Sequence, residues 1–385
     1  MKSGIYVHIP FCEQRCHYCA FTVAVSPDHA WEPYAKRVVR EIELSRFSDA
    51  PETIFFGGGT PSLIGAELIE AILAALPAAT AGPAAAKEMS LEANPGTLEV
   101  AKLEKYRDIG INRISLGAQS FQDSDLEIAG RIHKVRDIIC DFENLRRFGF
   151  SNINIDLIAG LPNQTLPGWK ENLDWLGRLR PEHVSVYMLD VEEHSVWGKK
   201  SSRAPHGEED EEHARFYLEA AERLSDLGYV HYEISNWALP GFECAHNLKY
   251  WTGAAYRGFG VSAHSFDGVS RFWNSSSLKE YAERIDSGLL PIAGREELTR
   301  QMRLDEAFLL GLRRIAGFNI WPVAEDLGIQ YSSEWFAAVE EMQRTGWIEF
   351  DGNVLKLAPA GWLLANGITE ELLWPSLLST SEATP

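Results

Sequence analysis

The chain has 385 residues, of which 45% are hydrophobic and 24% charged, a composition typical of a soluble globular protein. Its 36 basic and 55 acidic residues give a formal net charge of −19, which argues against general binding to nucleic acid or to an anionic membrane surface. No apolar run approaches the roughly 18 residues of a membrane span, and the N-terminus shows no apolar signal-peptide core. We therefore expect no nucleic-acid partner, no membrane span, and two or more domains.

Three of the five cysteines lie close together near the N-terminus with the spacing C-x3-C-x2-C, at Cys12, Cys16 and Cys19. A loop this short can turn three thiolates toward one point, and thiolates select soft metal centres. Iron–sulfur clusters are usually held by four cysteines, so three indicate a [4Fe–4S] cluster with one iron left open for a small chelator. Cysteines that stay reduced and bind metal fit the cytoplasm, where we expect the protein.

Other interpretations of this cysteine group account for fewer of its features. Zinc requires a fourth protein ligand, and although His8 or His17 could supply one, the spacing differs from the usual zinc motifs. A disulfide leaves one of the three cysteines unpaired and needs an oxidising compartment, of which the sequence gives no sign. Chance clustering of buried cysteines is disfavoured because the whole chain has only five.

The next elements alternate between helix and strand. Apolar residues at helical spacing predict a helix over 28–47, and the short apolar run 53–56 predicts a strand. That strand is ended by Gly57-Gly58-Gly59-Thr60-Pro61, a turn whose glycines let the backbone approach a ligand closely. A further helix is expected over 63–76, followed by a surface loop at 78–87.

The alternation continues toward residue 189. We predict strands at 89–95, 113–120, 152–158 and 183–189, separated by helices at 98–109, 121–148 and 169–179. Together with the apolar start of the chain, six strands alternate with helices, which implies a parallel sheet with right-handed crossovers. The fold class is therefore α/β, and the count suits a partial (β/α)6 barrel.

Polar side chains stand at or near the ends of several predicted strands. Glu92, Gln119 and Asp156 lie there, and Arg131 follows in Gly130-Arg131-Ile132-His133. Functional groups of parallel barrels collect at the C-terminal ends of the strands. Carboxylates accept hydrogen bonds from hydroxyls or an ammonium group, and arginine binds a carboxylate in a bidentate manner. Any one of these residues, taken alone, is better explained as a surface polar group. The prediction of a binding site therefore depends on all four residues together.

A second group of residues with ligand-binding chemistry lies at 246–251, where His246, Asn247, Tyr250 and Trp251 form the pattern H-N-x-x-Y-W. Histidine ligates heme iron, and tyrosine and tryptophan offer faces for stacking on a planar macrocycle. Aromatic clusters more often form core, and Cys244 and His264 are rival ligands. An acidic helix at 208–228 precedes this segment, and Cys140 in an apolar helix is expected to be core.

The character of the chain changes near residue 295. Helices at 298–315, 321–327 and 333–345, a hairpin at 347–357 and a closing helix at 363–373 predict a winged-helix-like domain. The helices are mixed or acidic, which favours a lid or a docking role over DNA binding. The expected division is 1–294 for the barrel with its H-N-x-x-Y-W extension, 295–375 for the C-terminal domain and 376–385 for a disordered tail.

The cluster loop resembles that of the radical S-adenosylmethionine (SAM) superfamily, whose motif is C-x3-C-x-aromatic-C. The flank Tyr6-x-His8-Ile9-Pro10-Phe11-Cys12 resembles the oxygen-independent coproporphyrinogen III oxidases and the related HemW-type heme chaperones. The oxidases carry a further cysteine two residues after the third. Phe21 stands at that position here, which points to the chaperone branch.

The resemblance implies roles for individual residues. Cys12, Cys16 and Cys19 would hold the cluster, and the ring of Tyr18 would pack near the adenine of SAM. The positions that match SAM contacts in the family are Tyr6, Gly58, Gly59, Thr60, Glu92, Gln119, Arg131 and Asp156. The H-N-x-x-Y-W segment resembles a signature of the chaperones, so His246, Asn247, Tyr250 and Trp251 are the expected heme site.

Three functions follow as hypotheses. The first is a heme chaperone with a [4Fe–4S] cluster and SAM that delivers heme to acceptor hemoproteins, expected in the respiratory chain, and that needs an electron donor. The second is an enzyme that uses SAM for the oxidative decarboxylation of coproporphyrinogen III, against which Phe21 is the discriminating feature. The third, an interaction protein with a vestigial site, is disfavoured because the cysteines and strand-end residues are intact. No residue is assigned a catalytic role.

Overall fold

A computed structural model of the chain describes residues 3–77, 86–199, 208–373 and 378–380. The chain forms two compact units. The first contains Met1–Val230, Trp237–His246 and Ala255–Glu296, and the second contains His231–Asn236, Asn247–Ala254 and Glu297–Pro385. Two short segments inside the range 1–294 predicted for the first domain thus belong to the second unit. Most of the loop predicted at 78–87 lies outside the described residues.

Six parallel strands form the centre of the first unit, in the spatial order β1-β4-β5-β6-β7-β8. Their bounds are β1 (Gly4–Ile9), β4 (Thr53–Gly58), β5 (Glu88–Ala93), β6 (Arg113–Gln119), β7 (Ile153–Ala159) and β8 (His183–Met188). The order follows the sequence, as expected when each crossover is a helix packed on one face of the sheet. The predicted parallel α/β fold is confirmed.

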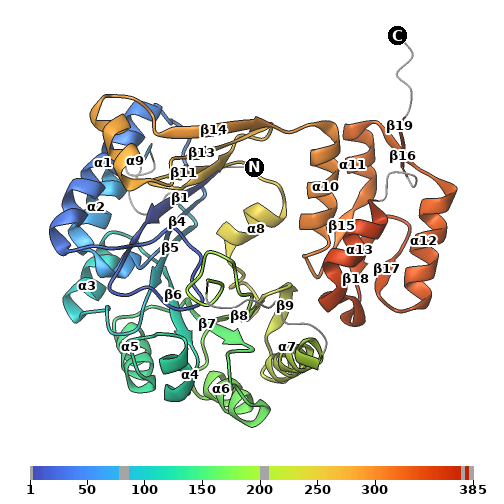
Figure 1. The fold of residues 1–385 in the computed structure, drawn as a ribbon, viewed down its shortest axis with the longest axis horizontal. Coiled ribbons are helices and arrows are strands. Elements are labelled where there is room, and N and C mark those ends of the chain that lie inside the picture. Colours follow the sequence, from blue (N-terminus) through green and yellow to red (C-terminus); the bar gives the residue numbers. More distant parts are fainter. Residues whose placement is uncertain (1–2, 78–85, 200–207, 374–377, 381–385) are drawn as a thin grey trace. The chain divides into compact units, whose positions relative to one another are not determined.

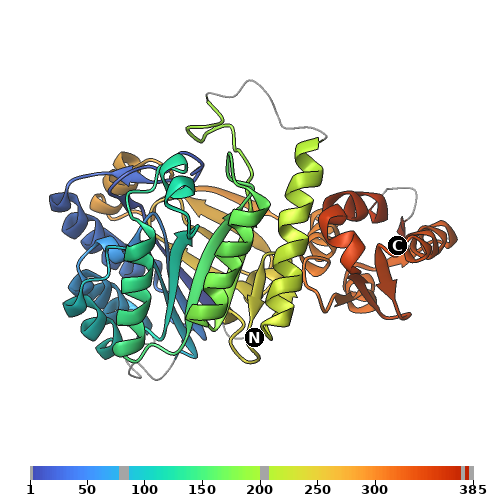
Figure 2. The ribbon, with the colours of Figure 1, turned by 90° about the horizontal axis from the view of Figure 1, so that it is seen from below.

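The helices between these strands lie on the outer side of the strand arc (Figure 1), and Figure 2 shows the same arrangement from below. The outward side chains of β1, Ile5, Val7 and Ile9, are fully buried beneath them. The bounds of these helices are η1 (Asp28–Ala30), α1 (Trp31–Ser45), η2 (Pro61–Leu63), α2 (Ala66–Ala75), α3 (Val100–Asp108), α4 (Asp123–Ile128), α5 (Val135–Arg147) and α6 (Leu166–Leu179). A further helix, α7 (Glu208–Asp226), follows β8.

The sheet continues beyond β1 in a region where the sequence predicted no strands. β11 pairs parallel with β1 and antiparallel with β12, which gives the order β14-β13-β12-β11-β1. The bounds are β11 (Tyr256–Phe259), β12 (His264–Phe266), β13 (Ser270–Asn274), α9 (Leu278–Asp286) and β14 (Ile292–Glu297). Glu41 on α1 is fully buried and connects this extension to α1. Its carboxylate accepts hydrogen bonds from Gly260 N, Asn274 Nδ2 and Tyr281 Oη.

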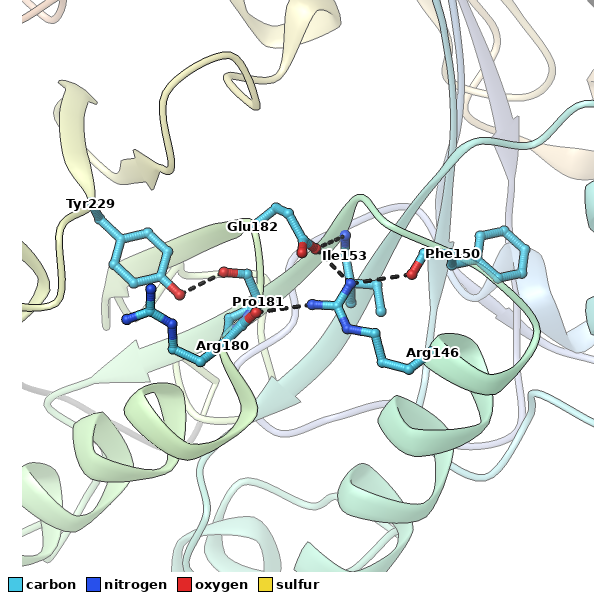
Figure 3. A network of polar contacts seen from close by, with 7 residues as sticks. All are labelled: Arg146, Phe150, Ile153, Arg180, Pro181, Glu182 and Tyr229. Carbon is cyan, nitrogen blue, oxygen red and sulfur yellow. Dashed lines mark hydrogen bonds and ion pairs between the residues drawn. The ribbon is translucent and has the colours of Figure 1, made fainter.

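A polar network ties the amino-terminal ends of β7 and β8 to the helices (Figure 3). The guanidinium of Arg146 donates to Glu182 Oε2 at 2.8 Å, to Phe150 O and to Arg180 O. Glu182 Oε2 also accepts from Ile153 N at the start of β7. Arg146 therefore provides hydrogen-bond donors to the loops that precede both strands. These loops lie at the amino-terminal ends of the strands, away from the predicted site.

In the second unit the helices α10, α11 and α12 precede a β17–β18 hairpin, the order expected for a winged-helix-like domain. Its core is mainly aliphatic, with Phe308 and Trp335 fully buried within it. The bounds are α10 (Arg300–Gly311), β15 (Phe318–Asn319), α11 (Ile320–Leu327), β16 (Ile329–Tyr331), α12 (Ser333–Arg344), β17 (Ile348–Phe350), β18 (Val354–Leu357), η4 (Pro359–Leu364), α13 (Ala365–Leu372) and β19 (Leu378–Thr380).

The hydrogen-bonding side chains that precede helices of this unit explain where the helices begin. Thr299, Asn319 and Ser332 each accept a hydrogen bond from a backbone N–H two or three residues further on, at the start of α10, α11 and α12. The prediction of a disordered tail from residue 376 needs correction in part, because β19 pairs antiparallel with β16.

Three shorter elements lie where the chain passes between the units: β9 (Val230–Glu233), β10 (Asn236–Ala238) and α8 (Ala245–Trp251). One residue expected in the core lies elsewhere. Cys140 is exposed, because the buried face of α5 is formed by Ile138, Asp141, Phe142 and Leu145. Within the described ranges, no helix is long and apolar enough to cross a membrane.

Candidate metal centre and cofactor site

The loop with the three predicted cluster cysteines leaves β1 at its carboxyl-terminal end. A short parallel pair, β2 (Phe11–Cys12) and β3 (Ala24–Val25), fixes the two ends of the loop. His17 anchors its middle, because the backbone N–H donates to Ala129 O at 3.0 Å and Nδ1 donates to Ile128 O at 2.8 Å. These two hydrogen bonds hold the loop against the end of α4, and neither involves a cysteine sulfur.

A continuous set of hydrogen bonds connects two of the cysteine sulfurs. Thr60 Oγ1 donates to Cys12 Sγ at 3.5 Å, and Asn94 Nδ2 donates to Thr60 Oγ1 at 2.8 Å. Arg131 Nη2 donates to Asn94 Oδ1 at 2.7 Å, and its Nη1 donates to Cys16 Sγ at 3.4 Å. We call these five residues the sulfur arc. Donors aimed at sulfur favour the thiolate over the thiol.

Burial opposes ionisation of two of the three cysteines in the metal-free protein. Burial raises the pKa of Cys12 to about 11, against the hydrogen bond from Thr60, and burial also raises the pKa of Cys19. Thiols with raised pKa values lose their protons when they ligate a metal, which stabilises the thiolate. Among the residues that the structure describes, no three His, Cys, Asp or Glu side chains converge on a single ion. Ligands of a [4Fe–4S] cluster bind separate irons and need no such convergence.

The glycine turn after β4 lies against β1 and the cluster loop. Gly58 has φ +118°, and a Cβ there would lie 2.6 Å from the ring of His8. A Cβ on Gly59 would lie 2.7 Å from Phe11 O. Only glycine allows these close contacts with His8 and Phe11. Gly58 N also donates to Glu92 Oε2 at 3.0 Å, so the turn and the carboxyl of β5 are joined.

Two half-buried carboxyl groups, Glu92 and Asp156, face the inside of the strand arc. Burial is the main cause that raises the pKa of Glu92 to about 8, with the nearby Asp156 charge adding to it and the Gly58 N–H opposing it. Burial also raises the pKa of Asp156, whose oxygens accept from Ser115 Oγ at 2.9 Å and Asn154 Nδ2 at 2.7 Å. Such groups suit a ligand that brings hydroxyl or ammonium donors of its own.

Gln119 lies beside the sulfur arc in a strained backbone conformation. Its φ is +68°, where the pairing of β6 with β7 shifts between Leu116 and Gln119. A Cβ on Gly117 would lie 3.0 Å from Gln119 Nε2 and 3.2 Å from Asn94 Oδ1, so the two amides approach each other. A polar pocket beside them is lined by Glu13, Gln14, Cys16, Asn94, Pro95, Gly130, Arg131, Ile132 and His133.

Both predicted tyrosines have defined partners in the first unit. The Tyr6 hydroxyl shares a hydrogen bond of 3.0 Å with His8 Nδ1, and His8 Nε2 donates to Thr22 O at 2.9 Å. Arg131 Nη1 donates to the Tyr18 hydroxyl at 3.5 Å, and the Tyr18 ring lies 6.4 Å from that of Trp197. The structure thus gathers the predicted SAM residues around the cluster loop and the strand ends.

Three residues of this neighbourhood were absent from the predicted set. Asn94 follows Glu92 at the end of β5, and His8 follows Tyr6 on β1, so both stand in segments that the sequence had marked. Trp197 reaches the site from the segment after β8, where its backbone N–H donates to His17 O at 3.0 Å. No signal in the sequence pointed to Trp197.

The predicted heme residue His246 lies at the opposite end of the strands from the cluster loop. Its side chain is 1% exposed, and its Nδ1 shares a hydrogen bond of 2.8 Å with Oγ1 of Thr53, the first residue of β4. Its backbone N–H donates at 3.0 Å to Oε1 of Glu88, the first residue of β5. Asn247, Tyr250 and Trp251 follow on α8 and belong to the second unit.

The two rival heme ligands differ in exposure. Cys244 is fully buried, and its thiol donates to Glu88 Oε1 at 3.4 Å. His264 on β12 is exposed, and its ring stacks on Trp273 at a centroid distance of 5.8 Å. His264 is thus already at the surface, whereas Cys244 and His246 would have to leave their buried positions to ligate a heme iron.

The profile of the Radical SAM superfamily matches residues 6–176. This match agrees with the parallel strand arc, the three loop cysteines and the glycine turn beside them, and the chain is a radical SAM protein. The fold is shared with coproporphyrinogen III oxidase (HemN) from Escherichia coli, described as a radical SAM enzyme, with a TM-score of 0.81 at 23% identity, covering 98% of this chain and 91% of that one.

Curated relatives define the family more narrowly. The heme chaperone HemW of Bacillus subtilis is 34% identical over 372 residues, covering 96% of this chain and 98% of the relative. That of Synechocystis is 36% identical over 363 residues, covering 91% and 87%. The chain therefore belongs to the HemW family of heme chaperones. Membership of the radical SAM superfamily implies a [4Fe–4S] cluster and SAM as cofactors, and the three cysteines with their sulfur arc fit the cluster.

Proposed function

We propose that this protein is a cytoplasmic heme chaperone that binds heme and delivers it to acceptor hemoproteins, with those of the respiratory chain as the expected class. The observation that carries the proposal is the 34% identity with a heme chaperone along 96% of the chain, together with an intact sulfur arc. The cluster would be held by Cys12, Cys16 and Cys19, and an electron donor would keep it in its working redox state.

In this proposal SAM binds between the cluster loop and the carboxyl ends of the strands. The superfamily uses SAM as a source of radical chemistry at the cluster. The Gly58–Gly59 turn provides a backbone surface, and Glu92 and Asp156 provide acceptors for hydroxyl or ammonium groups. Arg131 has its two terminal nitrogens on the sulfur arc beside Cys16, which supports a role for its charge in binding the SAM carboxylate.

Heme would bind at the H-N-x-x-Y-W segment, with His246 as the iron ligand. Because the His246 ring is buried against Thr53, ligation requires the first turn of α8 to open. His264 is the alternative ligand, favoured by its exposure. Partial desolvation of the ring and the charge of Arg271 lower its pKa, which keeps the imidazole neutral for coordination.

A second candidate function is the oxidative decarboxylation of coproporphyrinogen III. The overall fold is that of an enzyme with this activity, and the predicted SAM positions are all present. Phe21 argues against it, because the oxidases carry a cysteine at that position and here the phenylalanine side chain is 69% exposed. The exposed ring has no thiol to offer either a metal or a substrate.

One anaerobic experiment separates the two functions. The cluster is reconstituted, and the protein is incubated with SAM, a reductant and coproporphyrinogen III. The chaperone proposal predicts no protoporphyrinogen, together with stoichiometric binding of hemin in a separate titration. Multiple turnovers of protoporphyrinogen would instead identify an oxidase. Hemin titrations of His246→Ala and His264→Ala then assign the ligand, because only the variant that lacks it should bind hemin weakly.

A further inference from the structure

The inside of the strand arc contains a stack of aromatic rings that begins at His246. The His246 ring stacks on Phe55 with a centroid distance of 5.2 Å and an interplanar angle of 27°. Phe55 stacks in turn on Tyr6 at 6.3 Å and 23°. Tyr6 and Phe55 are direct neighbours in the register of β1 and β4, so the two rings project from the same face of the sheet.

The upper end of this stack lies in the proposed SAM site. The Tyr6 hydroxyl is bonded to His8, whose ring lies within 3 Å of where a Gly58 side chain would begin. A Cβ on Gly57 would lie 2.9 Å from Tyr6, 3.0 Å from Phe55 and 3.1 Å from Glu92 Oε1. The two rings and the carboxyl group therefore close around the glycine turn, and movement of one displaces the others.

The lower end of the stack is the position of His246 at the start of β4 and β5. Its Nδ1 is bonded to Thr53, and its backbone N–H to Glu88. Glu88 Oε2 also accepts from Ala245 N at 2.8 Å, so the first turn of α8 is pinned to the first residue of β5. Release of the His246 ring would break its bond to Thr53 and remove the ring that stacks on Phe55.

We propose that Phe55 is a positioning residue that couples the SAM site to His246, so that SAM and heme bind antagonistically. The proposal rests on heme binding at His246 and deepens that function. SAM holds the glycine turn, Glu92 and Tyr6 in place, which keeps Phe55 against the seated His246 ring. Heme ligation requires that ring to leave, which loosens Phe55 and the SAM site above it. Linkage makes the two effects equal: each ligand weakens the other by the same factor.

The chain offers a matched set of variants on one strand. Phe55→Leu keeps an apolar side chain of similar size but removes the ring from the stack, and Phe55→Tyr restores a ring. Phe56→Leu is the control, because Phe56 is fully buried on the opposite face of β4 and loses the same atoms without touching the stack. None of these residues belongs to the predicted cluster, SAM or heme contacts.

The test measures the affinity of the reconstituted protein for hemin with and without SAM, and for SAM with and without hemin. In the natural chain and in Phe56→Leu, SAM should weaken hemin binding by about fivefold or more, the low end of allosteric couplings. In Phe55→Leu the factor should fall to about one while both ligands still bind, and Phe55→Tyr should restore it. A factor that is the same in Phe55→Leu and in Phe56→Leu would overturn the proposal.

A measurement without heme distinguishes failure of the coupling from failure of the heme site. The rate at which diethyl pyrocarbonate modifies His246, measured by mass spectrometry, reports how often the ring leaves its buried position. SAM should slow this modification in the natural chain but not in Phe55→Leu. If SAM slows it and hemin still binds only through His264, the heme assignment is wrong and the coupling stands. If SAM has no effect on the rate, the coupling itself is refuted.

Discussion

Arg131 Nη2 donates a hydrogen bond of 2.7 Å to Asn94 Oδ1, and this single bond closes the sulfur arc between Cys12 and Cys16. Arg131 is fixed further by a 2.7 Å bond to Gly117 O. Burial acts to lower its pKa, but the neighbouring Tyr18 and Cys16 raise it on balance, so the guanidinium stays charged. A permanent positive charge is therefore held beside the thiolate of a cluster ligand.

Asn94→Ala is predicted to weaken cluster retention. The substitution removes the donor to Thr60 and the acceptor for Arg131, so the two halves of the arc separate. Loss of a buried hydrogen-bond partner costs about 1–3 kcal/mol. Reconstituted Asn94→Ala should therefore lose iron to a chelator faster than the natural protein, as measured by absorbance.

The matched control for this prediction is Asn144→Ala on α5. Asn144 is an asparagine whose side chain donates to the thiol of exposed Cys140, outside the sulfur arc. The control should release iron at the rate of the natural protein. Equal rates in Asn94→Ala and Asn144→Ala would contradict a role for the arc.

Arg131→Gln is predicted to weaken SAM binding more than it weakens cluster binding. The three cysteines remain, but the charge for the SAM carboxylate is lost. A hydrogen bond to a charged group contributes about 1.5–3 kcal/mol, so the Kd for SAM should rise about tenfold or more. Equilibrium dialysis with labelled SAM measures this, with the iron content of the same samples as the control. Unchanged SAM affinity at full iron content would exclude Arg131 from the SAM site.

Glu92 makes SAM binding dependent on pH. Burial and Asp156 raise its pKa to about 8 in the ligand-free protein, so it carries a proton at neutral pH. The positive groups of SAM favour the ionised form, so binding releases that proton and affinity rises as the pH approaches 8, by at most about tenfold per pH unit. Glu92→Gln should bind more weakly and lack this rise. Comparison of the two proteins cancels the titration of the amino group of SAM itself; parallel curves would count against Glu92.

Glu41 makes stability depend on pH. Burial raises its folded pKa to about 7, against hydrogen bonds from Gly260, Tyr281 and Asn274. Because the folded state holds the proton more tightly than the unfolded chain does, this contribution is full below the ordinary pKa of 4.5 and is lost as the pH rises through 7.

Thermal unfolding between pH 5 and 8 measures that loss, whose slope is at most about 1.4 kcal/mol per pH unit. Glu41→Gln should be less stable overall, since an amide cannot accept from all three donors, but its pH curve should be flatter. If the stability of Glu41→Gln depends on pH as steeply as that of the natural protein, a group other than Glu41 is responsible for the pH dependence.

The parallel strands could be predicted from the sequence because each is a buried apolar run followed by a turn. The strands of 256–297 could not, because β11, β12 and β13 have only three to five residues, and β14 lacks a buried apolar run. Their position depends on the contact of Glu41 with Gly260 and Asn274, more than two hundred residues away, which no local pattern encodes.

The candidate site could be predicted only in part, because some of its residues acquire their role through contacts between distant segments. Cysteines and carboxylates stand out by residue type, whereas Asn94 gains its role only through Thr60 and Arg131, which the fold brings to it. Cys140 illustrates the opposite error. It follows two isoleucines, but the helical period turns it to solvent while Asp141 is buried and accepts from Gly96 N.

The most direct test of the chaperone account is the transfer of heme under anaerobic conditions. The reconstituted protein is loaded with one equivalent of hemin and SAM and mixed with an apo-hemoprotein, and the Soret band of the acceptor is followed. The account predicts transfer up to one heme per chain, faster than from free hemin, and lost in Cys16→Ser. No transfer above the rate of Cys16→Ser, or of free hemin, would contradict it.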